Sequence, residues 1–329
     1  MSLLPKGQLF QKVLSAIQAS GVDAKVISGN HPFQLLLSYD GITEFVRVYI
    51  WNVTHGGGRA RAADEYRIQI TGVNRIRTGT NFRTLLLGWD ERHQVFVGYN
   101  AGRYETFGSS PSLQVRDGTL SSAARQGLAV QQKEFDSQGD VTEVVVAFKP
   151  ELFGAYTNNL DKYHQQKMTG LEATLLERVA TPRPPTDDEL ASLAEERRHI
   201  IREVEQAVRV GKFRKLVLQA YDNRCAVCGL GLGLVHAAHI VPVERGTDEP
   251  SNGIAMCPNH HAAFDRDILL IREDYSVNLN PRLNRTGNTT DLERILEQKR
   301  GMTLPNDPRL RPNPEYLRRR ANMRGIWFT

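Results

Sequence analysis

Hydrophobic residues in the first half of the chain recur with the period of one helix and then of many strands. Apolar residues at helical spacing between Leu9 and Ile17 predict an amphipathic helix over 6–20, which Gly21 ends. Clusters of Gly, Asn, Asp and Ser then separate the strand-like segments 24–28, 33–38, 44–53, 66–73, 83–89, 94–99 and 143–148. With a further helix over 119–126, residues 1–180 are predicted to form a mainly β domain with flanking helices.

The pattern changes at a proline-rich stretch. Residues 181–185 read Thr-Pro-Arg-Pro-Pro, which cannot continue a helix and predicts a stiff linker. Thr186 and Glu189 then form a capping box that opens a long charged helix through about Val210, and a short helix is expected over 213–221. The apolar positions of the long helix suit docking against a neighbouring domain or against a second copy of the chain.

Composition narrows the class of protein. The chain has 329 residues, 40% of them hydrophobic and 24% charged, which is typical of a globular α+β protein of about two domains. No apolar run approaches the roughly 18–20 residues that span a bilayer, so we expect no membrane contact. The first residues lack the apolar stretch of a signal peptide, and we therefore expect a cytoplasmic protein.

Net charge permits an anionic partner without requiring one. Lys and Arg number 42 against 37 Asp and Glu, a formal charge of +5, and the basic residues gather in two places. The first is the stretch 59–83, with Arg59, Arg61, Arg67, Arg75, Arg77 and Arg83. The second is the stretch 309–324, with Arg309, Arg311, Arg318, Arg319, Arg320 and Arg324. Each stretch is either a nucleic-acid contact or an ordinary solvated face.

The three cysteines give the sharpest chemical signal. Cys225 and Cys228 are followed, 29 residues after Cys228, by Cys257 and His260, so the chain holds two complete pairs of ligands at the spacing of a tetrahedral structural zinc site. The alternative is a set of buried cysteines that lie close by coincidence. The sequence therefore predicts that these four residues bind a structural Zn²⁺.

The segment that these pairs enclose resembles the HNH nuclease family, which has the ββα-metal fold. The family's H, N and H fall on His239, Asn252 and His261, and the likeness covers about residues 212–280. The resemblance implies that His239 is the general base, because a neutral imidazole accepts a proton from water near pH 7. It implies that Asn252 braces the connecting loop, and that His261 and Asp265, four apart on a helix, hold one catalytic divalent cation, with Mg²⁺ or Mn²⁺ expected.

One position departs from the family pattern. Many members carry a metal ligand immediately before the general base, where this chain has Ala238. The ligand set is then one short, unless His236 contributes. Either His236 completes the site or it is a solvent-facing residue in a turn. If the ion site is lost, the module is a non-catalytic zinc-stabilised DNA-binding protein.

The front domain is the place where sequence selectivity is expected, because backbone contacts carry little sequence information. Trp51, Arg59, Arg61, Arg75 and Arg77 combine an aromatic face with phosphate-binding side chains, and they suit base reading or a flipped base. The competing interpretation makes Trp51 a core residue and the arginines a solvated face. In the tail, Arg318, Arg319 and Arg320 suit phosphate contacts, the alternative being a frayed basic terminus.

The overall plan resembles a prokaryotic restriction endonuclease of the HNH type. The domains are then 1–180 for DNA recognition, 181–211 for the linker and long helix, 212–285 for the nuclease module and 286–329 for a basic tail. The expected partner is double-stranded DNA, with a modified base as one hypothesis and a homodimer as the form that cuts both strands. The alternative within the nuclease class is an effector of a phage-defence complex with little sequence specificity.

Overall fold

The computed structural model divides the chain into two compact units, Met1–Gly211 and Lys212–Thr329. It describes residues 3–39, 42–56, 62–108, 111–134, 142–164, 169–179, 181, 183–231, 234–242, 246–282 and 301–325. Among these residues, no helix combines the length and the apolar character needed to cross a membrane. The fold is mixed α+β, with a large sheet in unit 1 and a small zinc-ligand module in unit 2.

Unit 1 is organised around a seven-stranded sheet with the order β1-β2-β3-β6-β7-β10-β9. Its strands are β1 (Asp23–Ser28), β2 (Phe33–Tyr39), β3 (Ile42–Asn52), β6 (Arg83–Asp90), β7 (Val95–Tyr99), β9 (Leu128–Glu134) and β10 (Thr142–Phe148). Neighbours are antiparallel except β3 and β6, which are parallel. The crossover between these two contains β4 (Thr54–His55) and β5 (Glu65–Gln69), which form a second, three-stranded sheet with β8 (Ser112–Arg116).

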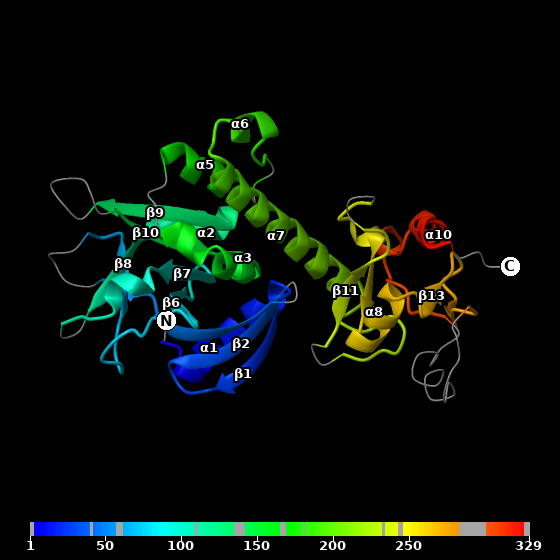
Figure 1. The fold of residues 1–329 in the computed structure, drawn as a ribbon, viewed down its shortest axis with the longest axis horizontal. Helices are drawn as coiled ribbons and strands as arrows, with labels where there is room; N and C mark the ends of the chain where they lie inside the picture. Colours follow the sequence, from blue (N-terminus) through cyan, green and yellow to red (C-terminus); the bar gives the residue numbers. More distant parts are fainter. Residues whose placement is uncertain are drawn as a thin grey trace. The chain divides into compact units, whose positions relative to one another are not determined.

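Both faces of the central strands are buried, and successive side chains along a strand join different hydrophobic cores. On β6, Leu85 and Leu87 join one hydrophobic core, whereas Leu86 joins the other. The first core lies under α1 (Lys6–Ala19) and the helices after β10, and the second lies under the small sheet and α2 (Asp117–Gln126). Figure 1 shows α1 lying beside β1–β3 and α2 beside β9 and β10.

Helices after β10 complete unit 1. They are η2 (Pro150–Leu152), α3 (Phe153–Asn158), α4 (Leu160–His164), α5 (Gly170–Arg178), α6 (Asp187–Ala191) and the beginning of α7 (Glu195–Ala220). The predicted capping box of Thr186 and Glu189 is present, but it opens only the short α6. The predicted helix 186–210 and short helix 213–221 are instead α6 and one 26-residue helix, α7, which passes through Gly211. A helical glycine costs only about 1 kcal/mol relative to alanine, so it does not break a helix that packing supports.

The apolar side chains that were predicted along the 186–210 helix pack mainly inside unit 1. Leu190, Leu193, Ile200, Ile201 and Val204 are all buried in the first core of unit 1. Of the two alternatives that the sequence left open, docking on a neighbouring domain therefore holds for these residues, which pack on their own unit.

The described residues of unit 2 form two short two-stranded sheets, the helices α8 and α10 and two 3-10 helices, and they include the end of α7. Its elements are the end of α7, β11 (His236–His239), η4 (Pro250–Asn252), β12 (Gly253–Met256), α8 (Pro258–Asp265), β13 (Leu269–Ile271), β14 (Val277–Leu279), η5 (Pro308–Leu310) and α10 (Pro314–Met323). Met302 and Leu317 are buried in the same core as β11 and β12. The described part of the predicted basic tail, residues 301–325, thus packs as part of unit 2.

Candidate nuclease site and zinc-ligand cluster

The four predicted zinc ligands lie together. The ligand atoms of Cys225, Cys228, Cys257 and His260 are all within 4.8 Å of one another. Sγ of Cys228 lies 3.9 Å from Sγ of Cys257, and Nδ1 of His260 lies 3.0 Å from Sγ of Cys257 and 3.6 Å from Sγ of Cys225. A tetrahedral ion with Zn–S bonds of about 2.3 Å needs S···S edges of roughly 3.8 Å, so the spacing fits zinc.

The chemistry of this donor set also calls for a cation. Burial, and beyond it the neighbouring Cys225, raise the pKa of Cys228 to about 12. Burial also raises the pKa of Cys257, so the thiols of Cys228 and Cys257 would resist losing their protons unless a positive ion compensates them. A bound metal reverses that balance, because it binds the thiolate form.

Strands β11 and β12 and helix α8 form the frame that holds the predicted general base. His239 ends β11 and pairs with Gly253, the first residue of β12. The imidazole of His239 stacks on Phe213 of α7, with ring centroids 3.8 Å apart and an interplanar angle of 8°. A Cβ atom on Gly253 would lie 2.8 Å from the Phe213 ring. Glycine at this position therefore leaves room for Phe213 to pack against the imidazole. The side chain of His239 remains 28% exposed.

A carboxylate that the sequence analysis did not identify holds the other edge of this imidazole. Nε2 of His239 lies 3.1 Å from Oδ1 of Asp248, whose side chain is 19% exposed. Asp248 lies in the loop between β11 and β12, nine residues after His239. No sequence motif marks it, and only the path of the loop brings it to the ring.

Asn252 organises that loop from inside. Its side chain is fully buried, its Oδ1 accepts a hydrogen bond from the Val241 N–H at 3.0 Å, and its Nδ2 donates to the carbonyls of Val241 and Thr247 at 2.9 and 2.8 Å. Both ends of the loop are thus tied to one amide group. This arrangement fixes where Asp248 meets His239.

His261 and Asp265 lie on α8 as their spacing predicts, with Nε2 and Oδ2 3.2 Å apart. Burial lowers the pKa of His261, and the nearby charges of Arg320, His239 and Arg214 lower it further against the opposing effect of Asp265. The imidazole of His261 is therefore favoured in its neutral, metal-binding form. The charge of Arg214 at this site is a second feature that the sequence analysis did not identify.

The remaining candidate ligand is close but does not complete a cluster. The ring of His236 lies edge-on to that of His261, with centroids 5.8 Å apart. Ala238 is fully buried in the unit 2 core and supplies no ligand. Within the described residues, the Cys₃His cluster is the one group in which three or more ligand atoms lie within 4.8 Å. The residues of α8 that could hold a second metal ion are therefore His261 and Asp265.

Two predicted DNA contacts are corrected. Trp51 is only 5% exposed and belongs to the second core of unit 1, where its indole N–H donates to the carbonyl of Thr71 at 3.2 Å. Arg320 has 11% of its side chain exposed, lies over the Phe264 ring and donates to the Ile240 carbonyl at 3.1 Å. Both side chains are used inside the protein.

The other predicted DNA contacts have mixed positions. Arg75 and Arg77 are exposed on the loop that precedes β6. Arg318 is exposed and forms ion pairs with Glu273 and Glu315, while Arg319 is exposed beside the ring of Tyr316. Arg59 and Arg61 lie outside the described residues.

Two family models match parts of this chain. Residues 225–272 match the family model described as HNH endonuclease. The chain carries a C-terminal HNH endonuclease domain. The match includes His239, Asn252, His261 and Asp265 together with all four residues of the Cys₃His cluster. Residues 45–157 of unit 1 match a second family model, described as Methylase-associated X1.

Comparisons with curated proteins and with solved structures do not extend this assignment. Among curated proteins none matches this chain. A solved structure titled "Modification dependent TagI restriction endonuclease" aligns over 85% of this chain and 81% of its own, with 13% sequence identity and a TM-score of 0.27. A score this low does not establish a shared fold.

Proposed function

We propose that this protein is a metal-dependent endonuclease that hydrolyses phosphodiester bonds of double-stranded DNA. The observation that carries the proposal is the arrangement of side chains around His239. Within the HNH endonuclease match, the partly exposed imidazole of His239 stacks on Phe213 and is hydrogen-bonded to Asp248, and it lies in the same small module as the His261–Asp265 pair. Imidazole and carboxylate groups in this arrangement suit the hydrolysis of a phosphodiester.

His239 would act as the general base. Because Nε2 faces Asp248, Nδ1 is the ring nitrogen left to accept a proton from the attacking water; none of the described residues bonds to it. Asp248 would hold the ring in this tautomer and stabilise the imidazolium that forms, so it is a positioning residue in the sense of a catalytic triad. Phe213 and Asn252 would fix the plane of the ring and the path of the loop.

His261 and Asp265 would hold the catalytic cation, for which we propose Mg²⁺ or Mn²⁺. Such an ion stabilises negative charge on the phosphate and on the departing 3′ oxygen. The positive charge of Arg214, close enough to His261 to lower its pKa, would favour the approach of a phosphate to the same place. Products are expected to carry 5′ phosphates.

The Cys₃His cluster would bind a structural Zn²⁺. Its residues flank β11 and β12 in sequence and contribute to the unit 2 core, so the ion would hold the frame on which His239 is mounted. It takes no part in the hydrolytic step.

Unit 1 would recognise the DNA, and a restriction role is the form of the proposal that we favour. Support comes from the description of the family model that residues 45–157 match, which associates that domain with a methylase. Exposed Arg75 and Arg77 would contact phosphates. Cutting both strands requires two sites or two successive nicks, so we also propose a homodimer on DNA, which light scattering with and without a duplex would test.

Incubation of the full-length protein with supercoiled plasmid and Mg²⁺ or Mn²⁺ tests the function. Discrete fragments with 5′ phosphate ends are expected, and a smear would instead indicate an unspecific effector nuclease. Intact plasmid with a retained gel shift would contradict the nuclease and leave a DNA-binding protein.

A further inference from the structure

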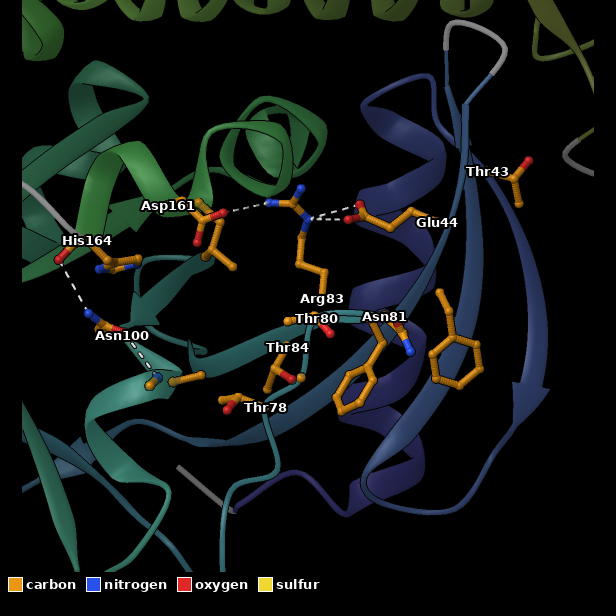
Figure 2. A pocket seen from close by; sticks show the side chains of 16 residues that line it. Thr43, Glu44, Thr78, Thr80, Asn81, Arg83, Thr84, Asn100, Asp161 and His164 are labelled. Atoms are coloured by element: carbon orange, nitrogen blue, oxygen red, sulfur yellow. Dashed lines mark hydrogen bonds and ion pairs between the residues drawn. The ribbon is translucent and has the colours of Figure 1, made fainter.

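A polar cavity opens in unit 1, on a different unit from the nuclease residues. It has a volume of about 550 Å³, and its walls come from the start of β3, the segment 78–84 that leads into β6, the turn 100–102 and helix α4. Figure 2 shows side chains from these four places surrounding one space. Cavities of this size hold ligands of nucleotide dimensions.

Hydrogen bonds and ring packing hold the wall formed by residues 78–84 in place. The N–H of Arg77 donates to the buried Tyr49 hydroxyl at 3.1 Å, and the Thr84 hydroxyl donates to the Arg77 carbonyl at 2.8 Å. The Phe82 ring packs so closely on Gly79 that a Cβ there would lie 2.6 Å from it. A wall held in this way loses little conformational entropy when a ligand binds.

Charge inside the cavity argues against a phosphate as its occupant. Among its lining residues the charged side chains are Glu44, Arg83 and Asp161, which sum to one negative charge. Arg83 donates from Nε to both carboxylate oxygens of Glu44, at 2.8 and 2.9 Å, and its guanidinium lies 3.9 Å from Asp161. Figure 2 shows the guanidinium between the two carboxylates. Asp161 keeps 68% of its side chain exposed, so its carboxylate can accept hydrogen bonds from N–H donors, and the net negative charge of the lining repels anions.

His164, which lines the cavity, is uncharged near neutral pH. His164 is 5% exposed, and its two ring nitrogens bond to the Val144 carbonyl and the Tyr156 hydroxyl, each at 2.8 Å. Burial lowers its pKa to about 4, so the ring carries no charge near pH 7. An uncharged ligand can therefore lie against it without an electrostatic cost.

Aromatic and amide groups complete the lining. Phe45 and Phe82 meet edge to face with centroids 6.4 Å apart. The Asn81 amide is exposed at the cavity and has no hydrogen-bond partner among the residues that the structure describes. The guanidinium of Arg47 lies over the Phe82 ring, 4.4 Å from its centroid, and covers one of its two faces. Aromatic rings, an amide and a carboxylate are the groups that bind a planar heterocycle with an amino substituent by stacking and by hydrogen bonds to its edge.

The exposed loop that leads in sequence into the cavity wall is basic, unlike the cavity lining. Arg75 and Arg77 are exposed on the loop that ends in the fixed wall, where they would meet phosphates. We propose that this cavity binds a single nucleobase that carries an amino group, cytosine or adenine or a derivative of either, presented by DNA whose backbone lies along the arginines. The inference rests on the proposed function of unit 1 as the DNA reader. A free nucleotide has the same base chemistry, and the experiment below separates the two sources.

The test uses the full-length chain with His239→Ala, so that binding is measured without cleavage. This protein selects from duplexes with a randomised centre, prepared with ordinary bases, with 5-methylcytosine or with N6-methyladenine, and the bound DNA is sequenced. We expect enrichment around a cytosine or adenine. Asn81→Ala and Phe82→Ala should reduce that enrichment about tenfold, since a well-formed base contact is worth that much discrimination.

Two further variants separate base recognition in the cavity from general effects on DNA binding. Asn30→Ala removes an exposed asparagine of the same unit that does not line the cavity, and it should leave the enrichment unchanged. Arg77→Ala should weaken binding to all sequences alike. Because Asn81 is exposed, its replacement keeps the fold even if Phe82→Ala lowers the melting temperature.

A second arm adds free deoxycytidine and deoxyadenosine and detects binding by saturation-transfer NMR. Nucleoside binding that Asn81→Ala abolishes, without enrichment in the duplex pool, would support the cavity and identify free nucleotides as the source of the base. Unchanged enrichment in Asn81→Ala and Phe82→Ala, or binding in neither arm, would overturn the proposal. The selection does not depend on cleavage, so the cavity and the nuclease can fail separately.

Discussion

The hydrogen bond between Asp248 and His239 offers the sharpest test of the site geometry. Asp248→Ala removes one carboxylate contact to the ring, 3.1 Å long and partly shielded from water. Hydrogen bonds to charged groups contribute about 1.5–3 kcal/mol, and because this one would strengthen as the imidazolium forms, kcat should fall by roughly 10- to 150-fold. Asp248→Asn keeps an acceptor oxygen and should fall less.

The assay follows plasmid nicking at saturating DNA, together with KM, zinc content and melting temperature. KM and zinc content should change less than about twofold, because Asp248 would act after DNA is bound. A ring ¹⁵N spectrum should show that His239 loses its preference for one tautomer. Asp274→Ala is the matched control, since it removes an exposed carboxylate that bonds to the Ser276 N–H. If both variants cut at the same rate, Asp248 does not position the base.

Three further predictions follow from the same structure. Cys225→Ser, or removal of zinc with a strong chelator, should unfold unit 2 and abolish cutting, because structural zinc binding contributes about 10–16 kcal/mol to folding; retained far-UV circular dichroism and activity would contradict this. Gly253→Ala should cost about 1–3 kcal/mol in urea unfolding and lower kcat, since its Cβ would clash with Val217 and lie 2.8 Å from the Phe213 ring and so displace Phe213 from beneath His239; an unchanged kcat would show that the stacking is not needed. His164 has a pKa lowered from 6.5 to about 4, so its neutral form stabilises the fold fully above pH 6.5, and that stability is lost as pH falls toward 4. By pH 5 the loss is about 2 kcal/mol, and His164→Gln should show a smaller acid loss than the parent in urea titrations at pH 7 and pH 5.

Local chemistry was predictable from sequence where spacing alone determines it. Cys225, Cys228, Cys257 and His260 form a cluster because each pair lies in one turn, and His261 and Asp265 meet because a helix places residues four apart on one face. The β-rich front domain also follows from the alternation of apolar residues, and most strands were placed within a few residues. These features are marked in the sequence by the spacing of ligand residues or by the alternation of apolar residues.

Contacts that no motif or residue spacing marks were not predictable. Asp248 reaches His239 only because Asn252 ties both ends of the loop, and Arg320 is drawn inside by partners 53–80 residues away. Trp51 was open to two interpretations, since a strand in a sheet that is covered on both faces gives no sign of which side chains meet solvent. The break between α6 and α7 was missed because the capping box marks where a helix begins and not where it ends.

The central claim is that the imidazole of His239 activates water for phosphodiester hydrolysis. His239→Ala in the full-length protein tests it directly, with plasmid cleavage, zinc content and melting temperature measured on the same preparation. We predict loss of cleavage by at least about 10²-fold, with zinc content, stability and DNA binding retained. Cleavage by that variant at the parent rate would contradict the claim.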